Sequence, residues 1–132
     1  MVTQQGTVLI VEDLLLMRQI IKSFLRRMGY ARLLEAEQGV EALTRLRQQP
    51  IDLVLADWDL PQMDGLALLT TMRAEAQWRT VPVVMITAEA SRDKVMTAIL
   101  AGANGYILKP FTRGTFEAKV TVIMARRPEP SG

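Results

Sequence analysis

The sequence predicts an α/β protein in which helices cover both faces of a parallel sheet of five strands. Extended apolar segments alternate five times with helical patterns along the 132 residues. Several extended segments, above all residues 51–56, are almost continuously apolar, which is typical of strands buried on both faces. The length suits one domain with a single core.

The first half of the chain predicts three strands and two helices. Residues 7–11 are a continuous apolar run and read as a buried strand. A helix is expected over 14–28, ended by Gly29, because apolar residues recur at helical spacing: Leu14, Met17, Ile21, Phe24, Leu25 and Met28. A short strand over 31–36 precedes a helix over 39–48 that ends before Pro50 and is expected to bury Val40, Leu43 and Leu46. Residues 51–56 form the third and most apolar strand.

The second half continues the alternation. A helix is expected over 66–74 and a strand over 82–87. Ser91 is a suitable N-cap for a helix that extends to Ala101, with Asp93 in its first turn and Gly102 after its end. Pro110 breaks a fifth strand over 106–109, and a last helix over 112–126 leaves residues 127–132 as a frayed tail. We therefore expect a single domain over residues 1–132, with its core at about 7–126.

Right-handed crossovers leave few topologies for five successive strand–helix units, and the doubly wound, flavodoxin-like order 2-1-3-4-5 is favoured. In this order the first and third strands are neighbours, and their connections leave in opposite directions. The crevice between their carboxyl ends is where ligands bind in open α/β sheets. Because Glu12 and Asp13 follow the first strand and Asp57 follows the third, we expect these carboxylates to meet there.

The fourth and fifth strands end at the same edge in Thr87 and Lys109. Like-charged carboxylates ~4 Å apart repel each other by about 4 kcal/mol per pair at an effective dielectric near ~20, and a divalent cation relieves this repulsion. Oxygen ligands suit Mg²⁺, with Mn²⁺ as a substitute. With a cation bound, a carboxylate is a competent nucleophile toward phosphorus. Lys109 offers a charge, and Thr87 a hydroxyl, to the phosphoryl oxygens.

This set of strand ends resembles the receiver domain of two-component response regulators, and in particular the single-domain receivers of chemotaxis. The resemblance is carried by Glu12-Asp13, Asp57, Thr87-Ala88 and Lys109-Pro110, and by the segments 57–65 and 105–112. It extends from about residue 7 to residue 124. It implies a stand-alone phosphorylation switch that signals through protein contacts and catalyses only its own phosphorylation and dephosphorylation, so it is not an enzyme in the metabolic sense.

The resemblance also implies how the phosphoryl group arrives and is held. Asp57 would accept it from a phosphohistidine of a sensor histidine kinase or a phosphotransfer domain. Asp13, Asp57 and the backbone carbonyl of Asp59 would bind Mg²⁺, and Glu12 would hold a water on the metal. Lys109, followed by a cis peptide bond, would pair with the phosphoryl oxygens.

A response to phosphorylation is implied as well. Thr87 would swing toward the phosphoryl group and Tyr106 would follow it inward. The family usually has Asp where this chain has Glu12. Asp59 and Glu89 place further carboxylates beside the crevice, at positions that in the resembling family tune how long the phosphoryl group survives; the direction of that tuning stays open.

Two surfaces are expected to meet partners. By helical angle Leu15 lies beside the crevice on a polar face shared with Arg18, Gln19, Lys22 and Arg26. We hypothesise that Leu15 contacts the partner that donates the phosphoryl group. The face of the last two helices around Tyr106 is expected to dock a downstream protein with an acidic surface, because it carries Arg92, Lys94, Arg113 and Lys119.

Composition excludes several classes of function. The chain has no histidine and no cysteine, so any phosphohistidine in its biology belongs to a partner, and neither an imidazole base nor a disulfide is available. A net charge of +2 without a dense basic run does not predict a nucleic-acid partner. No apolar stretch approaches the ~20 residues that span a bilayer, so no membrane insertion is expected. We expect a cytoplasmic monomer.

Other functions fit parts of the pattern. A phosphate sink or a relay receiver would carry the same residues. A phosphatase of the haloacid dehalogenase type also uses an Asp-x-Asp nucleophile, which Asp57-Trp58-Asp59 matches, but Pro61 stands where Thr or Val is expected. A flavodoxin-like flavin binder would need a phosphate-binding loop after the first strand, where the acidic pair at 12–13 would repel a phosphate.

Overall fold

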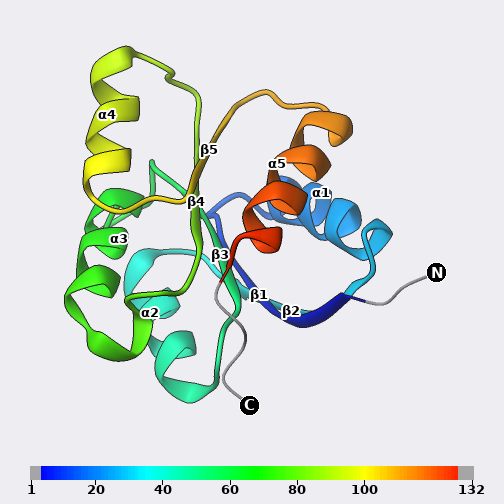
Figure 1. Ribbon diagram of the computed structural model, residues 1–132, viewed down its shortest axis with the longest axis horizontal. Coiled ribbons are helices and arrows are strands. Elements are labelled where there is room, and N and C mark those ends of the chain that lie inside the picture. Colours follow the sequence, from blue (N-terminus) through cyan, green and yellow to red (C-terminus); the bar gives the residue numbers. More distant parts are fainter. Residues whose placement is uncertain (1–3, 128–132) are drawn as a thin grey trace.

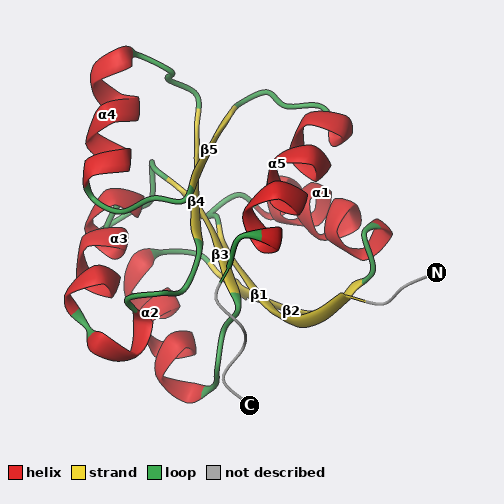
Figure 2. Ribbon diagram, in the orientation of Figure 1, coloured by secondary structure: helices red, strands yellow, loops and turns green. Residues whose placement is uncertain are grey.

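In the computed structural model, which describes residues 4–127, five parallel strands lie between two layers of helices (Figure 1, Figure 2). The strands are β1 (Gln4–Val11), β2 (Tyr30–Ala36), β3 (Leu53–Asp57), β4 (Val83–Thr87) and β5 (Gly105–Leu108). The helices are α1 (Leu15–Arg27), α2 (Gly39–Gln48), α3 (Gly65–Ala74), the short 3₁₀ helix η1 (Ala76–Trp78), α4 (Arg92–Leu100) and α5 (Arg113–Ala125). The predicted strand order 2-1-3-4-5 is confirmed.

Side chains alternate along each strand and so contribute to two cores. One core lies between the sheet and α2, α3 and α4, where Leu9, Val54 and Met85 are buried. The other lies between the sheet and α1 and α5, where Ile10 and Leu55 are buried. Because both faces are covered, every residue of β3 and of β4 is buried, which explains why their sequences are continuously apolar.

The ends of several elements differ from the prediction. β1 begins at Gln4, three residues early, and its pairing with β2 shifts register between Gln4 and Thr7, where Gly6 has a φ of +120°. β3 begins at Leu53, not at residue 51. Before it, the side chain of Asp52 takes the place of a backbone acceptor, because its Oδ2 accepts a hydrogen bond from the Thr7 amide at 2.8 Å. The helix η1, which carries the buried Trp78, was not expected.

Two side chains expected in the core are exposed. Leu14 is 60% exposed because it is the N-cap residue of α1 and not part of its first turn. Val40 is 47% exposed because the buried stripe of α2 is shifted by one residue from the prediction. That stripe consists of Gly39, Ala42, Leu43 and Leu46.

The expected frayed tail is only partly within the described residues. Arg127 is partly buried, and its Nη1 lies 3.8 Å from Oδ1 of Asp52, so the described part of the tail packs against the start of β3. Residues 128–132 lie outside the described residues.

Gly65 allows α3 to begin against the end of β3, and its replacement gives a test of this packing. A Cβ at position 65 would collide with the carbonyl oxygen of Asp57 and lie 2.9 Å from Cε of Met85. We expect Gly65→Ala to lower the free energy of unfolding by about 2–3 kcal/mol, measured by urea denaturation. The matched control is Gly114→Ala in α5, where the nearest heavy atom lies 4.0 Å away; it should raise stability by about 0.5–1 kcal/mol. Similar effects at both positions would contradict this account.

Candidate functional site

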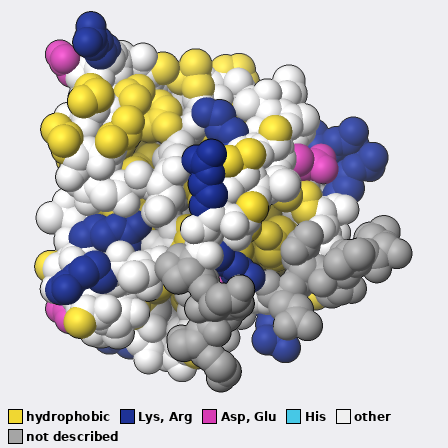
Figure 3. All heavy atoms as spheres, viewed as in Figure 1, with side chains coloured by type: hydrophobic (Ala, Val, Ile, Leu, Met, Phe, Trp, Pro, Cys, Tyr) yellow, Lys and Arg dark blue, Asp and Glu magenta, His cyan; other side chains and the backbone are white. Residues whose placement is uncertain are grey.

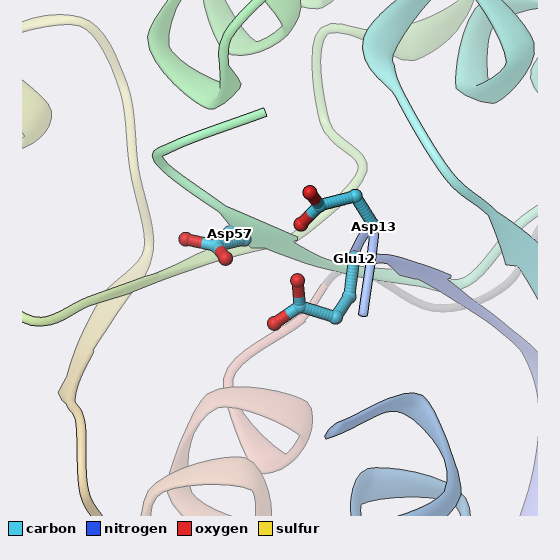
Figure 4. A group of neighbouring side chains, drawn as sticks. All are labelled: Glu12, Asp13 and Asp57. Carbon is cyan, nitrogen blue, oxygen red and sulfur yellow. The ribbon is translucent and has the colours of Figure 1, made fainter. Parts of the chain in front are cut away.

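The parallel register brings the acidic residues of two strands together. Val11 pairs with Ala56, so Glu12 and Asp57 follow at the same level on the neighbouring strands β1 and β3. One carboxylate oxygen from each of Glu12, Asp13 and Asp57 lies within 4.8 Å of the others. Figure 4 shows the three carboxylates converging on a common space from the two strand ends. We call these three residues the acidic site.

The acidic site is buried at its base and open at its mouth. Glu12 is 1% exposed and Asp57 is 6% exposed, whereas Asp13 is exposed. Ion-sized ligands can therefore approach from the side of Asp13, while the other two carboxylates lie in a region of low dielectric. Their mutual repulsion is stronger there than it would be in water.

Lys109 supplies the cation that this cluster requires within the protein. Its Nζ donates to Oδ2 of Asp57 at 2.7 Å and to Oε1 of Glu12 at 2.8 Å. Burial works to lower the pKa of Lys109, but the hydrogen bonds and charges of Asp57 and Glu12 outweigh it and raise that pKa above its ordinary value. The Lys109–Pro110 peptide is cis, as the resemblance implied.

Glu12 is the residue whose ionisation the fold disturbs most clearly. Its pKa is raised from 4.5 to about 7, mainly by burial; the hydrogen bond from Lys109 works in the opposite direction, and the charge of Asp57 and a hydrogen bond with Asp13 contribute to the rise. Oε2 of Glu12 also accepts a hydrogen bond from the Leu14 amide at 3.3 Å. The longer side chain of Glu12 thus reaches both Lys109 and the start of α1.

Thr87 and Tyr106 lie on the other side of the sheet. Side chains alternate along each strand. By this alternation Glu12, Asp57 and Lys109 belong to the side of the sheet that carries the core under α1 and α5, whereas Tyr106 packs against the core under α4. Thr87 is fully buried at the end of β4.

The backbone of Glu89 connects these two residues. Its amide donates to Oγ1 of Thr87 at 3.2 Å, and its carbonyl accepts a hydrogen bond from the Tyr106 hydroxyl. Burial raises the pKa of the Tyr106 hydroxyl, so the group remains a donor at neutral pH. A displacement of Thr87 would therefore be felt by Tyr106 through one residue of the β4–α4 loop.

Trp58 and Asp59 follow Asp57 directly. The Asp59 amide donates to Oδ1 of Asp57 at 3.1 Å, and the Asp59 side chain is exposed. Trp58 is 7% exposed, and the ammonium of Lys94 lies 4.7 Å from the centroid of its ring. Lys94 also lies 3.4 Å from the carboxylate of Glu89.

The expected basic face around Tyr106 is less available than the sequence suggested. Lys94 is 19% exposed because it covers Trp58, and Nζ of Lys119 donates to the Tyr106 carbonyl at 2.6 Å. Arg113 forms an ion pair with Glu117 at 3.2 Å. The same face is instead notably apolar: hydrophobic side chains gather over α4 in Figure 3, and the exposed ones on α4 and β5 are Met96, Ile99, Leu100 and Leu108.

The polar face predicted around Leu15 also needs correction. Leu15 is 59% exposed, as expected, and Leu14 and Leu16 beside it are 60% and 74% exposed. Arg18, expected on the same solvated face, is buried and bonded to Glu35. The sequence held a signal for this contact, because Glu35 and Glu37 stand at alternate positions in and after the second strand, where a basic side chain of the preceding helix can reach them.

A second hollow lies at the opposite edge of the sheet. It has a volume of about 480 Å³ and is lined among others by Pro50, Trp78 and Val81, at the amino ends of β3 and β4. In parallel α/β sheets the ligand site is at the carboxyl ends of the strands. The acidic site, which is at those ends, is therefore the candidate functional site.

Comparisons with known proteins agree with this geometry. The family model described as the response regulator receiver domain matches residues 8–121. The chain is 44% identical to chemotaxis protein CheY-3 of Vibrio cholerae over 119 residues, which is 90% of this chain and 92% of that protein.

Two solved structures are similar in fold. The chemotaxis response regulator CheY4 of Vibrio cholerae has a TM-score of 0.85 at 28% identity and covers 91% of this chain and 99% of its own. The receiver domain of a sensor histidine kinase from Pseudomonas aeruginosa, solved with a magnesium ion coordinated in its active-site cleft, has a TM-score of 0.82 at 30% identity, covering 92% and 99% of the two chains. Within residues 4–127, none of the helices has the length and hydropathy needed to cross a bilayer.

The raised pKa of Glu12 predicts a pH dependence of stability when divalent cations are chelated. A carboxyl whose pKa rises from 4.5 in the unfolded chain to about 7 in the folded protein binds its proton more tightly when folded. Its contribution to stability is therefore full below pH ~4.5 and is lost as the pH rises to ~7, by on the order of 3 kcal/mol at most. In EDTA, raising the pH from 4.5 to 7.5 should lower the free energy of unfolding more for the parent than for Glu12→Gln. Identical pH profiles of the two proteins would refute this prediction.

Proposed function

The chain belongs to the response regulator receiver domain family, and on that premise we propose that it is a response regulator whose Asp57 accepts a phosphoryl group from a histidine kinase or phosphotransfer partner. The observation that carries the proposal is the contact of Asp57 with Lys109 at 2.7 Å within the acidic site. A nucleophilic carboxylate, a cation for the phosphoryl oxygens and further carboxylates for a metal all lie at one strand edge.

In the proposed transfer, a carboxylate oxygen of Asp57 attacks the phosphorus of the partner's phosphohistidine. The P–N bond breaks, and the imidazole leaves with the electron pair and takes up a proton from solvent. Lys109, which already donates to Oδ2 of Asp57, keeps its proton because its pKa is raised, and it can stabilise the negative oxygens during transfer. Hydrolysis of the acyl phosphate by water would reset the protein, so the chain would catalyse only its own phosphorylation and dephosphorylation.

The donor set of the acidic site fits Mg²⁺. Carboxylate oxygens of three residues lie within 4.8 Å of one another, the site is open at Asp13, and the chain has no histidine or cysteine that would favour a softer metal. We propose that Asp13, Asp57 and the Asp59 carbonyl hold the ion, with Glu12 acting through a water, and that Mn²⁺ can substitute. When bound, the ion would neutralise carboxylate and phosphoryl charge. The magnesium ion in the similar receiver of the Pseudomonas aeruginosa kinase supports this assignment.

The proposed response passes through Thr87 and Tyr106. A phosphoryl group on Asp57 adds acceptor oxygens near the end of β4, and the Thr87 hydroxyl is a donor that can turn toward them. That rotation would alter the bond which Thr87 accepts from the Glu89 amide, and Glu89 also binds the Tyr106 hydroxyl. The surface of α4, β5 and α5 around Tyr106 would change as a result.

We propose that this surface binds the downstream protein. Its exposed apolar residues on α4 and β5 form a contact area. The exposed Arg92 of α4 and Arg113 of α5 favour a partner with acidic groups. Similarity to the chemotaxis proteins of Vibrio cholerae supports a role in chemotaxis-type signalling. A phosphate sink or a relay receiver would use the same chemistry without this output. We propose that residues 1–132 act as one monomeric domain; its cytoplasmic location stays a prediction.

Phosphorylation at Asp57 is testable with Trp58, the adjacent buried indole. Trp58 fluorescence should change on addition of Mg²⁺ and again on addition of acetyl phosphate or beryllofluoride, because both add charge beside the ring. Asp57→Asn should abolish the second change, and acetyl phosphate should label the parent at no more than one group per chain. The matched control is Asp59→Asn, which removes an exposed carboxylate two residues away and should keep the second change. Steady turnover of p-nitrophenyl phosphate would instead indicate a phosphatase.

The exposed leucines at the start of α1 predict where the phosphodonor binds. An apolar patch beside the acidic site consists of Leu14, Leu15 and Leu16, which are all exposed. Exposure of this apolar surface to water is unfavourable, and a bound partner that covers it would remove that cost. Leu15→Ser should slow phosphotransfer from the kinase by about tenfold, equivalent to ~1.4 kcal/mol, while labelling by acetyl phosphate is unchanged. Leu100→Ser, which replaces a still more exposed leucine (80% against 59% for Leu15) on the proposed output face, should leave the transfer rate at the parent value. Unchanged transfer to Leu15→Ser would remove the proposed contact.

A further inference from the structure

Arg18 is a buried cation that the proposed chemistry does not use. It lies in α1, and its side chain is only 9% exposed. A guanidinium is always charged and needs several acceptors when it is buried. Its Nη1 donates to the backbone carbonyl of Glu12 at 2.7 Å, and its Nε donates to Oε1 of Glu35 at 3.0 Å. The side chain thus connects β2 to the end of β1.

Glu35 is held on the far side of this connection. Its second carboxylate oxygen accepts a hydrogen bond from Nζ of Lys22 at 3.1 Å, and its backbone carbonyl accepts one from Nε of Arg45 at 3.2 Å. Glu37 lies 3.6 Å from Nη2 of Arg18 and adds a second, more exposed carboxylate. With its charge directed toward these acids, the guanidinium of Arg18 does not need a carboxylate of the acidic site as a partner.

The bond from Arg18 fixes the backbone on which the acidic site is built. The Glu12 amide donates to the Ala36 carbonyl at 2.9 Å, and the Glu12 carbonyl accepts from Arg18. The peptide that follows this carbonyl leads directly to Asp13, the exposed member of the acidic site. Because Asp13 directly follows Glu12, the orientation of the Glu12 carbonyl group sets the direction of the chain at Asp13. It therefore also sets where the Asp13 carboxylate lies at the mouth of the site.

We propose that Arg18, anchored by Glu35, is a positioning residue that orients the β1–α1 turn so that Asp13 can act with Asp57 on a divalent cation. The inference rests on the proposed function, because it concerns how that same site binds Mg²⁺. Groups that orient metal ligands in this way typically contribute ten- to a hundredfold to metal affinity, by order of magnitude.

The charge of Arg18 and its positioning role predict opposite effects on Mg²⁺ affinity when Arg18 is replaced, which makes the inference testable. Removing a cation near three carboxylates should by itself strengthen Mg²⁺ binding. Loss of positioning should weaken it. Lys22 offers a matched control, because it binds the same Glu35 and carries the same charge but does not contact Glu12.

The experiment is a Mg²⁺ titration followed by Trp58 fluorescence, without a phosphodonor, on the parent and on Arg18→Met and Lys22→Met. Arg18→Met should raise the Kd for Mg²⁺ about tenfold, whereas Lys22→Met should leave it unchanged or slightly lower. Arg18→Lys, which restores one donor, should fall between the parent and Arg18→Met. Circular dichroism and urea unfolding in EDTA report the folded fraction separately, so that a purely structural role would lower stability while the folded protein kept the parent Kd.

The outcomes separate this inference from the proposed function. A folded Arg18→Met that binds Mg²⁺ as tightly as the parent, or more tightly, would overturn the positioning role and leave the proposed function standing. A parent that shows neither a Mg²⁺ response nor labelling at Asp57 would overturn both. If Arg18→Met does not fold, Glu35→Gln takes its place: it keeps the guanidinium but weakens its anchor, and it should raise the Kd about threefold; an unchanged Kd would refute the inference.

Discussion

Electrostatic repulsion among three carboxylates at the end of a parallel sheet is the interaction on which the rest of this structure depends. The sheet imposes it, because in-register strands carry Glu12 and Asp57 to the same level. Lys109 balances one negative charge by contacting both residues. With every group ionised, three carboxylates and one ammonium leave two net negative charges, so the site retains the charge that one divalent cation can neutralise.

The alternation of side chains along the strands places the acidic site on one side of the sheet and Thr87 and Tyr106 on the other. By position along their strands, Glu12, Asp57 and Lys109 belong to the side of the sheet that faces α1 and α5, and Tyr106 packs against the core under α4. Thr87 lies on the same side as Tyr106, and Glu89 connects the two at the carboxyl edge, through a loop and not through the packed interior. In the proposed switch, a displacement of Thr87 toward Asp57 would reach Tyr106 without repacking either core, and packed cores resist continuous deformation.

The sequence could predict the positions of those site residues that stand at the ends of strands. A residue that directly follows a buried strand must lie at the edge of the sheet, so the positions of Asp57, Thr87 and Lys109 followed from local patterns once the strand order was favoured. The exposure of Val40, the burial of Arg18 and the cover of Lys94 over Trp58 did not follow, because each depends on how a helix is rotated and tilted on the sheet. In α2 the buried stripe begins at Gly39, one residue before the predicted Val40, and a difference of that size decides whether a flanking residue faces the core or solvent.

Charge counting also explains why the proposed switch would have a direction. A divalent cation would make the site of Glu12, Asp13, Asp57 and Lys109 neutral, so an incoming phosphoryl group would not be repelled. Transfer replaces the single charge of Asp57 by about −2 on an acyl phosphate, which leaves roughly one negative charge in excess. The Lys109 ammonium is already shared between two carboxylates, and the Thr87 hydroxyl, at the end of the neighbouring strand β4, is a further donor that could turn toward the phosphoryl group. In the proposed switch, the excess charge would be relieved further in the conformation that brings Thr87 toward Asp57, and such a differential interaction is what a two-state change requires.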